Sequence, residues 1–257
     1  MSGHVLGVEK EGGILTLRMD RPDKRNALNG AMVEALIRGL DGPGGGDDVR
    51  VILLRGEGPD FCAGADLAEL EATMDQAPEE SLADARRLGG LFLAMRRHPR
   101  PIVAAVQGRA LAGGCGLATA CDLVLARDDA ELGYPEVHLG FVPAMVMAIL
   151  RRKLTEGRAF ELVSMGERIG AREAHRLGLV NRIFPAAEFE DGVAGFAREL
   201  ARRPSSAVTL IKELLYELDD LPFDEGIEAG ARVNVEARST EACREGVGRF
   251  LARKSSP

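Results

Sequence analysis

Residues 102–122 read IVAAVQGRALAGGCGLATACD, a short apolar run followed by a stretch of small residues. The run Ile102–Val106 is bounded by proline on one side and by polar and glycine residues on the other. Such a run is typical of a strand buried on both faces of a parallel sheet. The tripeptide Ala112–Gly114 predicts a short helix directly after that strand, with its first N–H groups facing a developing negative charge. Because parallel α/β sheets bind ligands at such strand ends, this segment predicts both a fold class and a site.

The flanking sequence repeats the alternation of short strands and helices. Alternating hydropathy and short apolar runs predict further strands at Ile14–Met19, Val51–Leu54 and Leu123–Leu125. Apolar residues at helical spacing predict a helix over 32–40, which ends at the glycine-rich stretch from Gly42. A second helical pattern covers 79–97 and ends at a His-Pro-Arg-Pro sequence. The chain is therefore predicted to be α/β.

Beyond Pro143 the pattern is almost wholly helical. Helices are predicted at 143–153, 155–165, 171–177, 186–202, 205–218, 223–237 and 240–253. We therefore expect an α/β core over residues 1–195 and a helical C-terminal region over residues 196–257. One apolar stripe in this region comprises Ala207, Val208, Ile211, Leu214 and Leu215. It needs a partner surface, for which a second copy of the chain and the chain's own core are equally good candidates.

Length and composition indicate one soluble domain with an appendage. The chain has 257 residues, 46% of them apolar and 28% charged, and no run approaches the ~18 apolar residues that cross a bilayer. The N-terminus lacks a basic start followed by an apolar segment, so we expect no signal peptide, no membrane contact and a cytoplasmic location. The net charge of −7, the absence of Trp and the presence of only two Tyr disfavour nucleic acid as a partner.

The cysteines and histidines do not follow a metal-binding pattern. The sequence contains no CxxC and no HExxH, so we expect no metal site. Cys62 and Cys115 lie in glycine-rich segments, where a thiol nucleophile is one interpretation. Neither has a histidine near it in sequence, and a small buried thiol is the stronger interpretation for both.

Two further segments carry chemistry. FCAGADL, residues 61–67, has small residues that let backbone N–H groups approach a ligand, and Asp66 is positioned to cap a helix starting near Leu67. LGYPEVHLGFVP, residues 132–143, sets the carboxylate of Glu136 among apolar neighbours. Desolvation would disfavour its ionised form and prepare a general acid/base, whereas a glutamate on a surface loop is the alternative. Each glycine-rich turn alone is equally compatible with a tight turn or close helix packing, and none has the GxGxxG or GK[ST] pattern of nucleotide sites.

The three segments together, in this order and spacing, resemble the crotonase family, also called the enoyl-CoA hydratase/isomerase superfamily. The resemblance covers nearly the whole chain, from RPDKRNAL at residues 21–28 to EGVGRF at residues 245–250. It implies a crotonase-like spiral of ββα units with a helical C-terminal region that covers the acyl-CoA site and forms trimers, often paired into hexamers. It also implies an acyl-CoA thioester substrate, with coenzyme A as part of the substrate and no separate cofactor.

The resemblance assigns roles residue by residue. It implies that the N–H groups of Ala65 and Gly113 form an oxyanion hole for the thioester oxygen and that Glu136 is the acid/base. The substrate-binding positions that it implies are Lys24, Arg25, Ala27, Ala63, Asp66, Leu67, Ala68, Gly116, Tyr134, Phe141 and Phe250.

One departure from the family pattern affects the reaction itself. Family hydratases typically carry a second glutamate where Gly116 stands, and water addition with Glu136 alone holds less water in place. Isomerisation needs only one base, so a Δ3-Δ2 enoyl-CoA isomerase is the alternative to an enoyl-CoA hydratase, which is the leading interpretation. A non-catalytic acyl-CoA-binding relative is a further alternative.

Two other departures concern binding. Many family members have a glycine-rich stretch after Pro143, and this chain has bulky residues there. Met145 and Met147 are expected in the core, and a place in an acyl pocket is the weaker interpretation. Family members also often carry a basic residue where Ala68 stands. The expected phosphate contacts are therefore Lys24 or Arg25, or Arg253 and Lys254 of a neighbouring subunit. The alternative for all four side chains is that they are only solvated.

Overall fold

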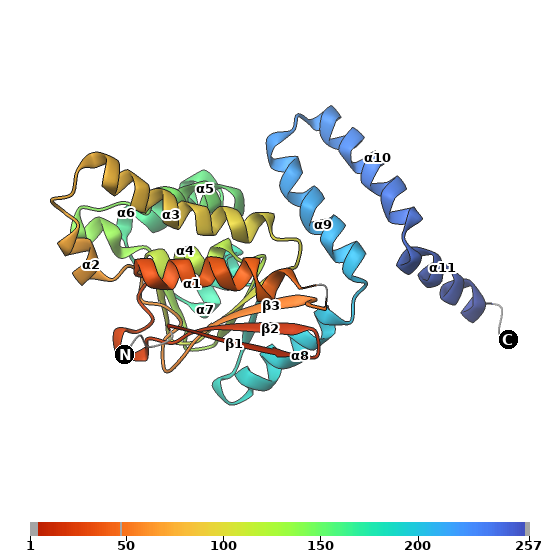
Figure 1. The fold of residues 1–257 in the computed structure, drawn as a ribbon, viewed down its shortest axis with the longest axis horizontal. Helices are drawn as coiled ribbons and strands as arrows, with labels where there is room; N and C mark the ends of the chain where they lie inside the picture. Colours follow the sequence, from red (N-terminus) through yellow and green to blue (C-terminus); the bar gives the residue numbers. More distant parts are fainter. Residues whose placement is uncertain (1–4, 47, 255–257) are drawn as a thin grey trace.

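The computed structural model describes residues 5–46 and 48–254, and its centre is a six-stranded sheet in the order β1-β2-β3-β4-β6-β9 (Figure 1). The β1–β2 hairpin is antiparallel, and every later pair of neighbours is parallel. The strands are β1 Leu6–Glu11, β2 Ile14–Met19, β3 Val51–Gly56, β4 Ile102–Val106, β6 Leu123–Arg127 and β9 Arg182–Phe184. The sheet confirms the predicted α/β class.

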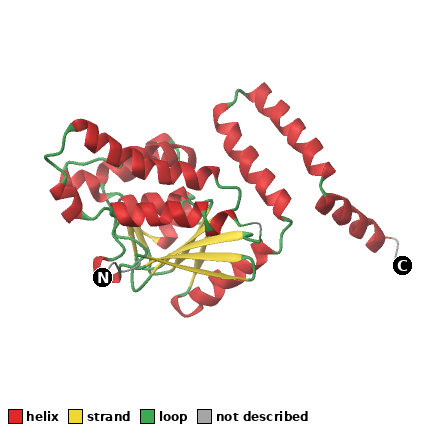
Figure 2. Cartoon of the chain, viewed as in Figure 1, coloured by secondary structure: helices red, strands yellow, loops and turns green. Residues whose placement is uncertain are grey.

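Helices cover both faces of this sheet, as Figure 2 shows in red around the yellow strands. Helices α1 and α3 to α6 lie on one side and α8 lies on the other (Figure 1). The helices are α1 Gly30–Asp41, α2 Leu67–Ala72, α3 Pro78–Arg97, α4 Gly113–Ala120, α5 Ala144–Lys153, α6 Glu156–Met165, α7 Ala171–Leu177, α8 Phe189–Ala201, α9 Ser205–Glu217, α10 Phe223–Ser239 and α11 Glu241–Lys254. The predicted helices lie within a few residues of these bounds.

Side chains of the central strands alternate between two apolar cores, one on each face of the sheet. In β4, Ile102, Ala104 and Val106 belong to the larger core, and Val103 and Ala105 belong to the smaller core under α8. Successive side chains of a strand point to opposite faces, so a strand covered on both sides must be apolar throughout. The prediction that the apolar run at 102–106 is a strand buried on both faces is confirmed.

A second, three-stranded sheet leads into the candidate site. It has the order β5-β7-β8, with β5 Arg109–Leu111, β7 Glu131–Gly133 and β8 Arg168–Gly170. Helix α4 begins at Gly113, which confirms the predicted start of a short helix at Ala112–Gly114. It does not follow β4 directly, contrary to the expectation, because β5 intervenes. Gly108, with φ +54°, turns the chain so that β5 can pair with β7 instead of continuing the main sheet.

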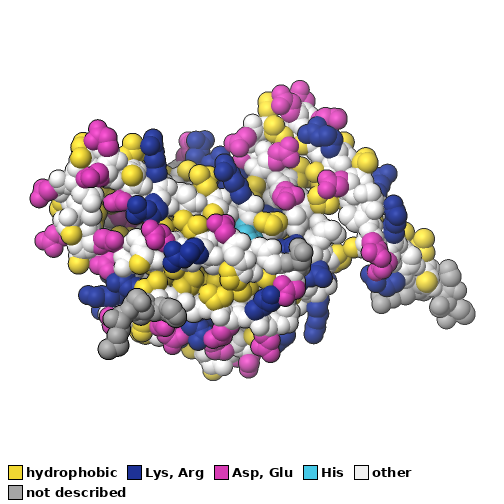
Figure 3. All heavy atoms as spheres, viewed as in Figure 1, with side chains coloured by type: hydrophobic (Ala, Val, Ile, Leu, Met, Phe, Trp, Pro, Cys, Tyr) yellow, Lys and Arg dark blue, Asp and Glu magenta, His cyan; other side chains and the backbone are white. Residues whose placement is uncertain are grey.

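Helices α9 to α11 form an arm that extends from the body of the protein (Figure 1). Ile211 and Leu215 of the predicted apolar stripe are 66% and 60% exposed. Val208 and Leu214 are half-buried, so the chain's own residues cover the stripe only in part. The expected boundary between residues 195 and 196 falls inside α8, whose Val193 and Ala197 are buried. Figure 3 shows a hollow between arm and body, and acidic and basic side chains interspersed over this face. No helix in the described part of the chain is long and apolar enough to cross a membrane.

Candidate active site

Two backbone N–H groups lie close together where β5 leads into α4. A β-carbon built on Gly113 would lie 4.0 Å from the amide nitrogen of Ala65. Gly113 is the first residue of α4, and the first N–H groups of a helix have no partner within the helix. Among the described residues, neither of these two N–H groups donates to a backbone carbonyl elsewhere. Two free donors side by side are suited to an oxygen that gains negative charge during a reaction.

Pairing with Leu28 fixes the segment that carries Ala65. The Leu28 N–H donates to the Gly64 carbonyl at 2.7 Å, and the Asp66 N–H donates to the Leu28 carbonyl at 2.8 Å. These two bonds use backbone groups on either side of Ala65 and leave the Ala65 amide unused. The sequence segments at 24–28 and 61–67 are therefore neighbours in space.

The backbone around the two donors is crowded and partly strained. Gly64 has φ +107°, and a β-carbon on it would lie 2.9 Å from the Ala112 β-carbon and 3.0 Å from the Leu111 carbonyl oxygen. Ala112 has φ +50° and ψ −129°, a conformation that costs a non-glycine residue about 1–3 kcal/mol. Its N–H donates to the Gly133 carbonyl at 2.8 Å, which ties α4 to the end of β7. Strain that the surroundings hold in place is typical of functional sites.

Glu136 lies three residues beyond β7, on the 3-10 helix Pro135–Leu139. It is only 8% exposed, and within the described chain its buried Oε2 has no hydrogen-bond partner. Desolvation raises the pKa of this carboxyl above its usual range. Since Gly133 at the end of β7 holds Ala112 directly before α4, the topology brings this carboxylate to the same end of α4 as the free amides. A buried, unpartnered oxygen is costly unless a ligand or proton uses it.

The surroundings of Glu136 differ from the predicted apolar cluster. Tyr134 is fully buried and contacts Thr119 through a 3.0 Å hydrogen bond between the hydroxyls. The other apolar neighbours in the segment are exposed: Val137, Leu139, Phe141 and Val142. The expectation that they enclose the carboxylate is wrong for the single chain, because the 3-10 helix turns them outward. Desolvation therefore comes from the core beneath the site, including Tyr134.

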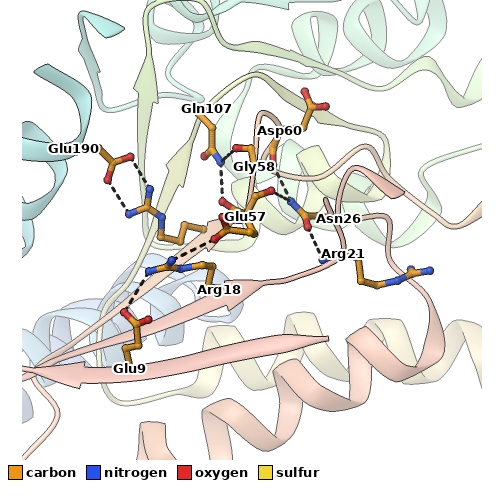
Figure 4. A network of polar contacts seen from close by, with 11 residues as sticks. Glu9, Arg18, Arg21, Asn26, Glu57, Gly58, Asp60, Gln107 and Glu190 are labelled. Atoms are coloured by element: carbon orange, nitrogen blue, oxygen red, sulfur yellow. Dashed lines mark hydrogen bonds and ion pairs between the residues drawn. The ribbon is translucent and has the colours of Figure 1, made fainter. Parts of the chain in front are cut away.

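The basic turn at Lys24 and Arg25 lies beside the Ala63–Ala65 segment. The Ala63 N–H donates to the Arg25 carbonyl at 3.0 Å, while the side chains of Lys24 and Arg25 are exposed. Buried Asn26, with φ +55°, supports this turn. Its Oδ1 accepts from the Arg21 N–H at 2.9 Å (Figure 4). Its Nδ2 donates to the carbonyls of Glu57 and Asp60, both at 2.9 Å (Figure 4).

Sequence reasoning missed Asn26 and Arg21 as supports of the site. Arg21 donates to the Ala27 carbonyl at 2.7 Å and to Asp66 Oδ2 at 2.8 Å. The hydrogen bond from this guanidinium lowers the pKa of Asp66. Asp66 Oδ1 accepts from the Ala68 N–H at 3.2 Å, which confirms the predicted helix cap. Both oxygens of Asp66 thus hold the loop, while Leu67 and Ala68 are exposed beside it.

Cys62 and Cys115 are buried directly under the two glycine-rich turns. Burial raises the pKa of each thiol to about 12. A thiol with such a pKa is not ionised near neutral pH and is a poor nucleophile. A β-carbon on Gly114 would lie 2.2 Å from the Cys62 carbonyl oxygen, so the turns also pack tightly. The buried-thiol interpretation is confirmed.

Comparison with known proteins decides the family of this site. The sequence profile of the enoyl-CoA hydratase/isomerase family matches residues 9–257. The chain belongs to this family. Its members act on acyl-CoA thioesters, and the chain has their crotonase fold.

The relatives match over nearly their whole length. A Thermus thermophilus protein with a provisional enoyl-CoA hydratase name is 39% identical over 96% of this chain and 97% of its own. The 2,3-dehydroadipyl-CoA hydratase of Escherichia coli is 32% identical over 96% of each chain. The crystal structure of an enoyl-CoA hydratase from Mycobacterium smegmatis superposes with a TM-score of 0.93 at 29% identity, covering 97% of each chain.

Two departures from the family pattern meet in space. A β-carbon on Gly116 would lie 2.4 Å from Cγ2 of Val146, which stands on α5 in the stretch that is glycine-rich in many family members. Val146 is 4% exposed. Its neighbour Met145 packs on the larger core, as expected, whereas Met147 is about half exposed, so the expectation of a core position is wrong for Met147. The sequence gives no sign that positions 116 and 146 touch.

Some implied substrate contacts are not brought together in one chain of this family member. Phe250 lies on α11, in the arm (Figure 1), whereas Glu136 lies on the 3-10 helix Pro135–Leu139. Phe141 is exposed on the loop after the 3-10 helix. The side chains of Arg253 and Lys254, named with the basic residues of the turn, lie outside the described part of the structure.

Proposed function

We propose that this chain is an enoyl-CoA hydratase that uses one carboxylate. The thioester oxygen binds the N–H groups of Ala65 and Gly113, and Glu136 faces the acyl carbons. Water oxygen bonds to C3 while the C2–C3 π electrons move toward the thioester oxygen, and Glu136 takes the proton that the water loses. Glu136 then returns a proton to C2 as the enolate collapses. The observation that carries this proposal is the buried, unpartnered Oε2 of Glu136.

The magnitudes are adequate for catalysis. Loss of one oxyanion-hole donor in a comparable site costs about 2.7–4 kcal/mol, and positioned acid/base groups contribute about 10²–10⁴ in rate. The raised pKa of Glu136 makes its carboxylate a stronger base toward water. Hydration is also the reaction named for the Escherichia coli relative.

Coenzyme A enters this proposal only as part of the substrate, and no further cofactor is required. The exposed side chains of Lys24 and Arg25 are suited to its phosphates, because their turn lies beside the Ala63–Ala65 segment. Arm residues such as Phe250 would then reach the site of a neighbouring subunit in a homotrimer or a dimer of trimers. Light scattering on the purified protein would give the oligomeric state.

A second candidate is a Δ3-Δ2 enoyl-CoA isomerase. It is favoured by the contact between Val146 and Gly116, which leaves an apolar side chain beside the position where family hydratases carry their second glutamate. Glu136 would then move a proton between C4 and C2 through the same enolate, without water.

The two reactions differ in product mass. Purified protein is offered a trans-2-enoyl-CoA and a 3-enoyl-CoA, and products are followed by mass spectrometry. The hydratase proposal expects the 2-enoyl substrate to gain one water. Turnover of the 3-enoyl substrate alone, with no gain in mass, would establish the isomerase instead. Calorimetric binding without turnover of either substrate would indicate the non-catalytic acyl-CoA-binding relative.

A further inference from the structure

Gly116 lies on the face of α4 that also carries the oxyanion donor Gly113. Residues three apart share one face of a helix, and they are separated by about 4.5 Å along its axis. A β-carbon on Gly113 would lie 3.6 Å from Leu28, next to the turn with the exposed basic residues. A thioester bound at Gly113 with its coenzyme A toward Leu28 therefore extends its acyl carbons toward Gly116.

Val146 covers this face at Gly116. Its Cγ2 lies 2.4 Å, and its Cβ and Cγ1 both 3.5 Å, from the position of a β-carbon on Gly116. The whole isopropyl group thus stacks on the glycine. Valine in a helix has essentially one side-chain rotamer, so this surface is rigid as well as apolar.

Neighbouring packing prevents Val146 from moving aside easily. Val146 is buried in the larger apolar core, and α4 and α5 pack against each other. The preceding residue, Met145, brings its Sδ to 3.4 Å from the position of a β-carbon on Gly89 of α3. Helix α5 is therefore held against both α4 and α3 around this point.

We propose that Val146, seated on Gly116, sets the size of the acyl group that fits beside the thioester and selects straight-chain over 3-methyl-branched enoyl-CoA substrates. This inference rests on the proposed function, because it assumes that the acyl group extends from the Ala65 and Gly113 donors. A branch at C3 adds a methyl group on the side where the valine methyl already stands. One methyl or methylene in an apolar pocket changes kcat/KM by about 10–200-fold.

The test compares Val146→Ala with wild type on crotonyl-CoA and 3-methylcrotonyl-CoA. Val146→Ala is expected to shift the ratio of the two kcat/KM values toward the branched substrate by about 10-fold or more. The matched control is Val49→Ala, which removes the same methyl groups from the same core just before β3 begins, at the end of the parallel strands opposite to the end that leads into the site. It should leave the ratio unchanged. A folded Val146→Ala protein whose ratio changes no more than that of Val49→Ala would overturn the proposal.

Gly116→Ala supplies a second, independent test of the contact between Gly116 and Val146. The added β-carbon must displace Val146, so the single variant should lose turnover of both substrates, and the double variant Gly116→Ala/Val146→Ala should recover it. Calorimetric titration with butyryl-CoA and 3-methylbutyryl-CoA measures the same selection without turnover. If no variant turns over any enoyl-CoA but Val146→Ala still gains affinity for the branched thioester, the proposed reaction fails and the size selection stands. Equal affinities in wild type and Val146→Ala would remove the size selection.

Discussion

Lys212 Nζ lies 2.8 Å from Asp122 Oδ2, and this buried ion pair joins the arm to the body. The same ammonium group donates to the carbonyls of Met95 and Arg100, both at 3.1 Å. Tyr216, one turn further along α9, donates its hydroxyl to Asp122 Oδ1 at 2.5 Å. Since much of the apolar stripe on α9 is exposed, these polar contacts fix the direction in which the arm leaves the body.

Lys212→Met should therefore destabilise the protein strongly. Removing one partner of a buried pair leaves the other charge uncompensated, which costs about 3–5 kcal/mol. Chemical denaturation followed by circular dichroism gives this difference. Lys10→Met is the control, because its partner Asp48 is solvent-exposed and such pairs contribute about 0–1 kcal/mol. Equal losses of unfolding free energy in the two variants would show that the buried pair stabilises the fold no more than the exposed pair does.

Glu136→Gln should lose activity and gain stability. Turnover of enoyl-CoA is expected to fall by about 10²–10⁴ because the amide cannot accept or return the proton. The raised pKa of Glu136 means that the folded state holds its proton to higher pH than the unfolded state. Above both pKa values the buried ionised carboxylate destabilises the fold, so the neutral amide should raise the free energy of unfolding at pH 7.

The pH dependence separates this explanation from a general packing effect. The gain in unfolding free energy from Glu136→Gln should shrink as the pH falls through the folded-state pKa of Glu136 toward 4.5, the ordinary value for glutamate. The wild-type carboxyl then becomes neutral too. In the same range kcat/KM of the wild type should fall, since the base becomes protonated. Thermal unfolding and initial rates at several pH values test both. A stability difference that does not change with pH would contradict the desolvation of Glu136.

Much of the fold was predictable because its signals are local. A single segment of sequence is enough to indicate the burial of the apolar strands β3 and β4. The same holds for the apolar periodicity of the helices α1, α3 and α9. The second sheet has no such local signal, because three-residue strands such as β5 carry no periodicity and exist only through pairing with β7.

The candidate site likewise has features that local sequence indicates and features that depend on distant contacts. Small residues after strands indicate where backbone donors such as Ala65 and Gly113 lie, and the isolated carboxylate indicates Glu136. The supporting contacts are non-local. Asn26 reads as one more polar loop residue until its partners, more than thirty positions away, are known. The contact of Gly116 with Val146 likewise depends on how α4 packs on α5.

Asn26→Ala tests this support. The change leaves the Glu57 and Asp60 carbonyls without a donor and puts alanine at φ +55°, so we expect a loss of about 3 kcal/mol in the free energy of unfolding. If the turn holds coenzyme A, KM for acyl-CoA should rise more than kcat falls. Asn26→Gly is the matched control, since glycine tolerates the backbone angle but lacks the hydrogen bonds. Normal stability in Asn26→Gly would assign the effect to the backbone alone.

Gly64→Ala tests the oxyanion hole most directly. The new β-carbon would lie 2.9 Å from the Ala112 β-carbon and 3.0 Å from the Leu111 carbonyl oxygen, at a φ of +107° that alanine avoids. The segment must shift, and with it the N–H of Ala65. Displacing one donor should lower kcat by about 10²–10³ with a smaller change in KM, because the donor acts mainly on the charge of the transition state.

The control for this variant is Gly90→Ala on α3. A β-carbon at Gly90 would meet no atom within 4 Å, and alanine in a helix interior is favoured over glycine by about 0.5–1 kcal/mol. Gly90→Ala should therefore keep full activity and unfold at the same or a higher temperature. Steady-state kinetics with circular dichroism on both variants makes the comparison. A folded Gly64→Ala protein with near-normal kcat would remove Ala65 from the oxyanion hole and leave Gly113 as its proposed donor.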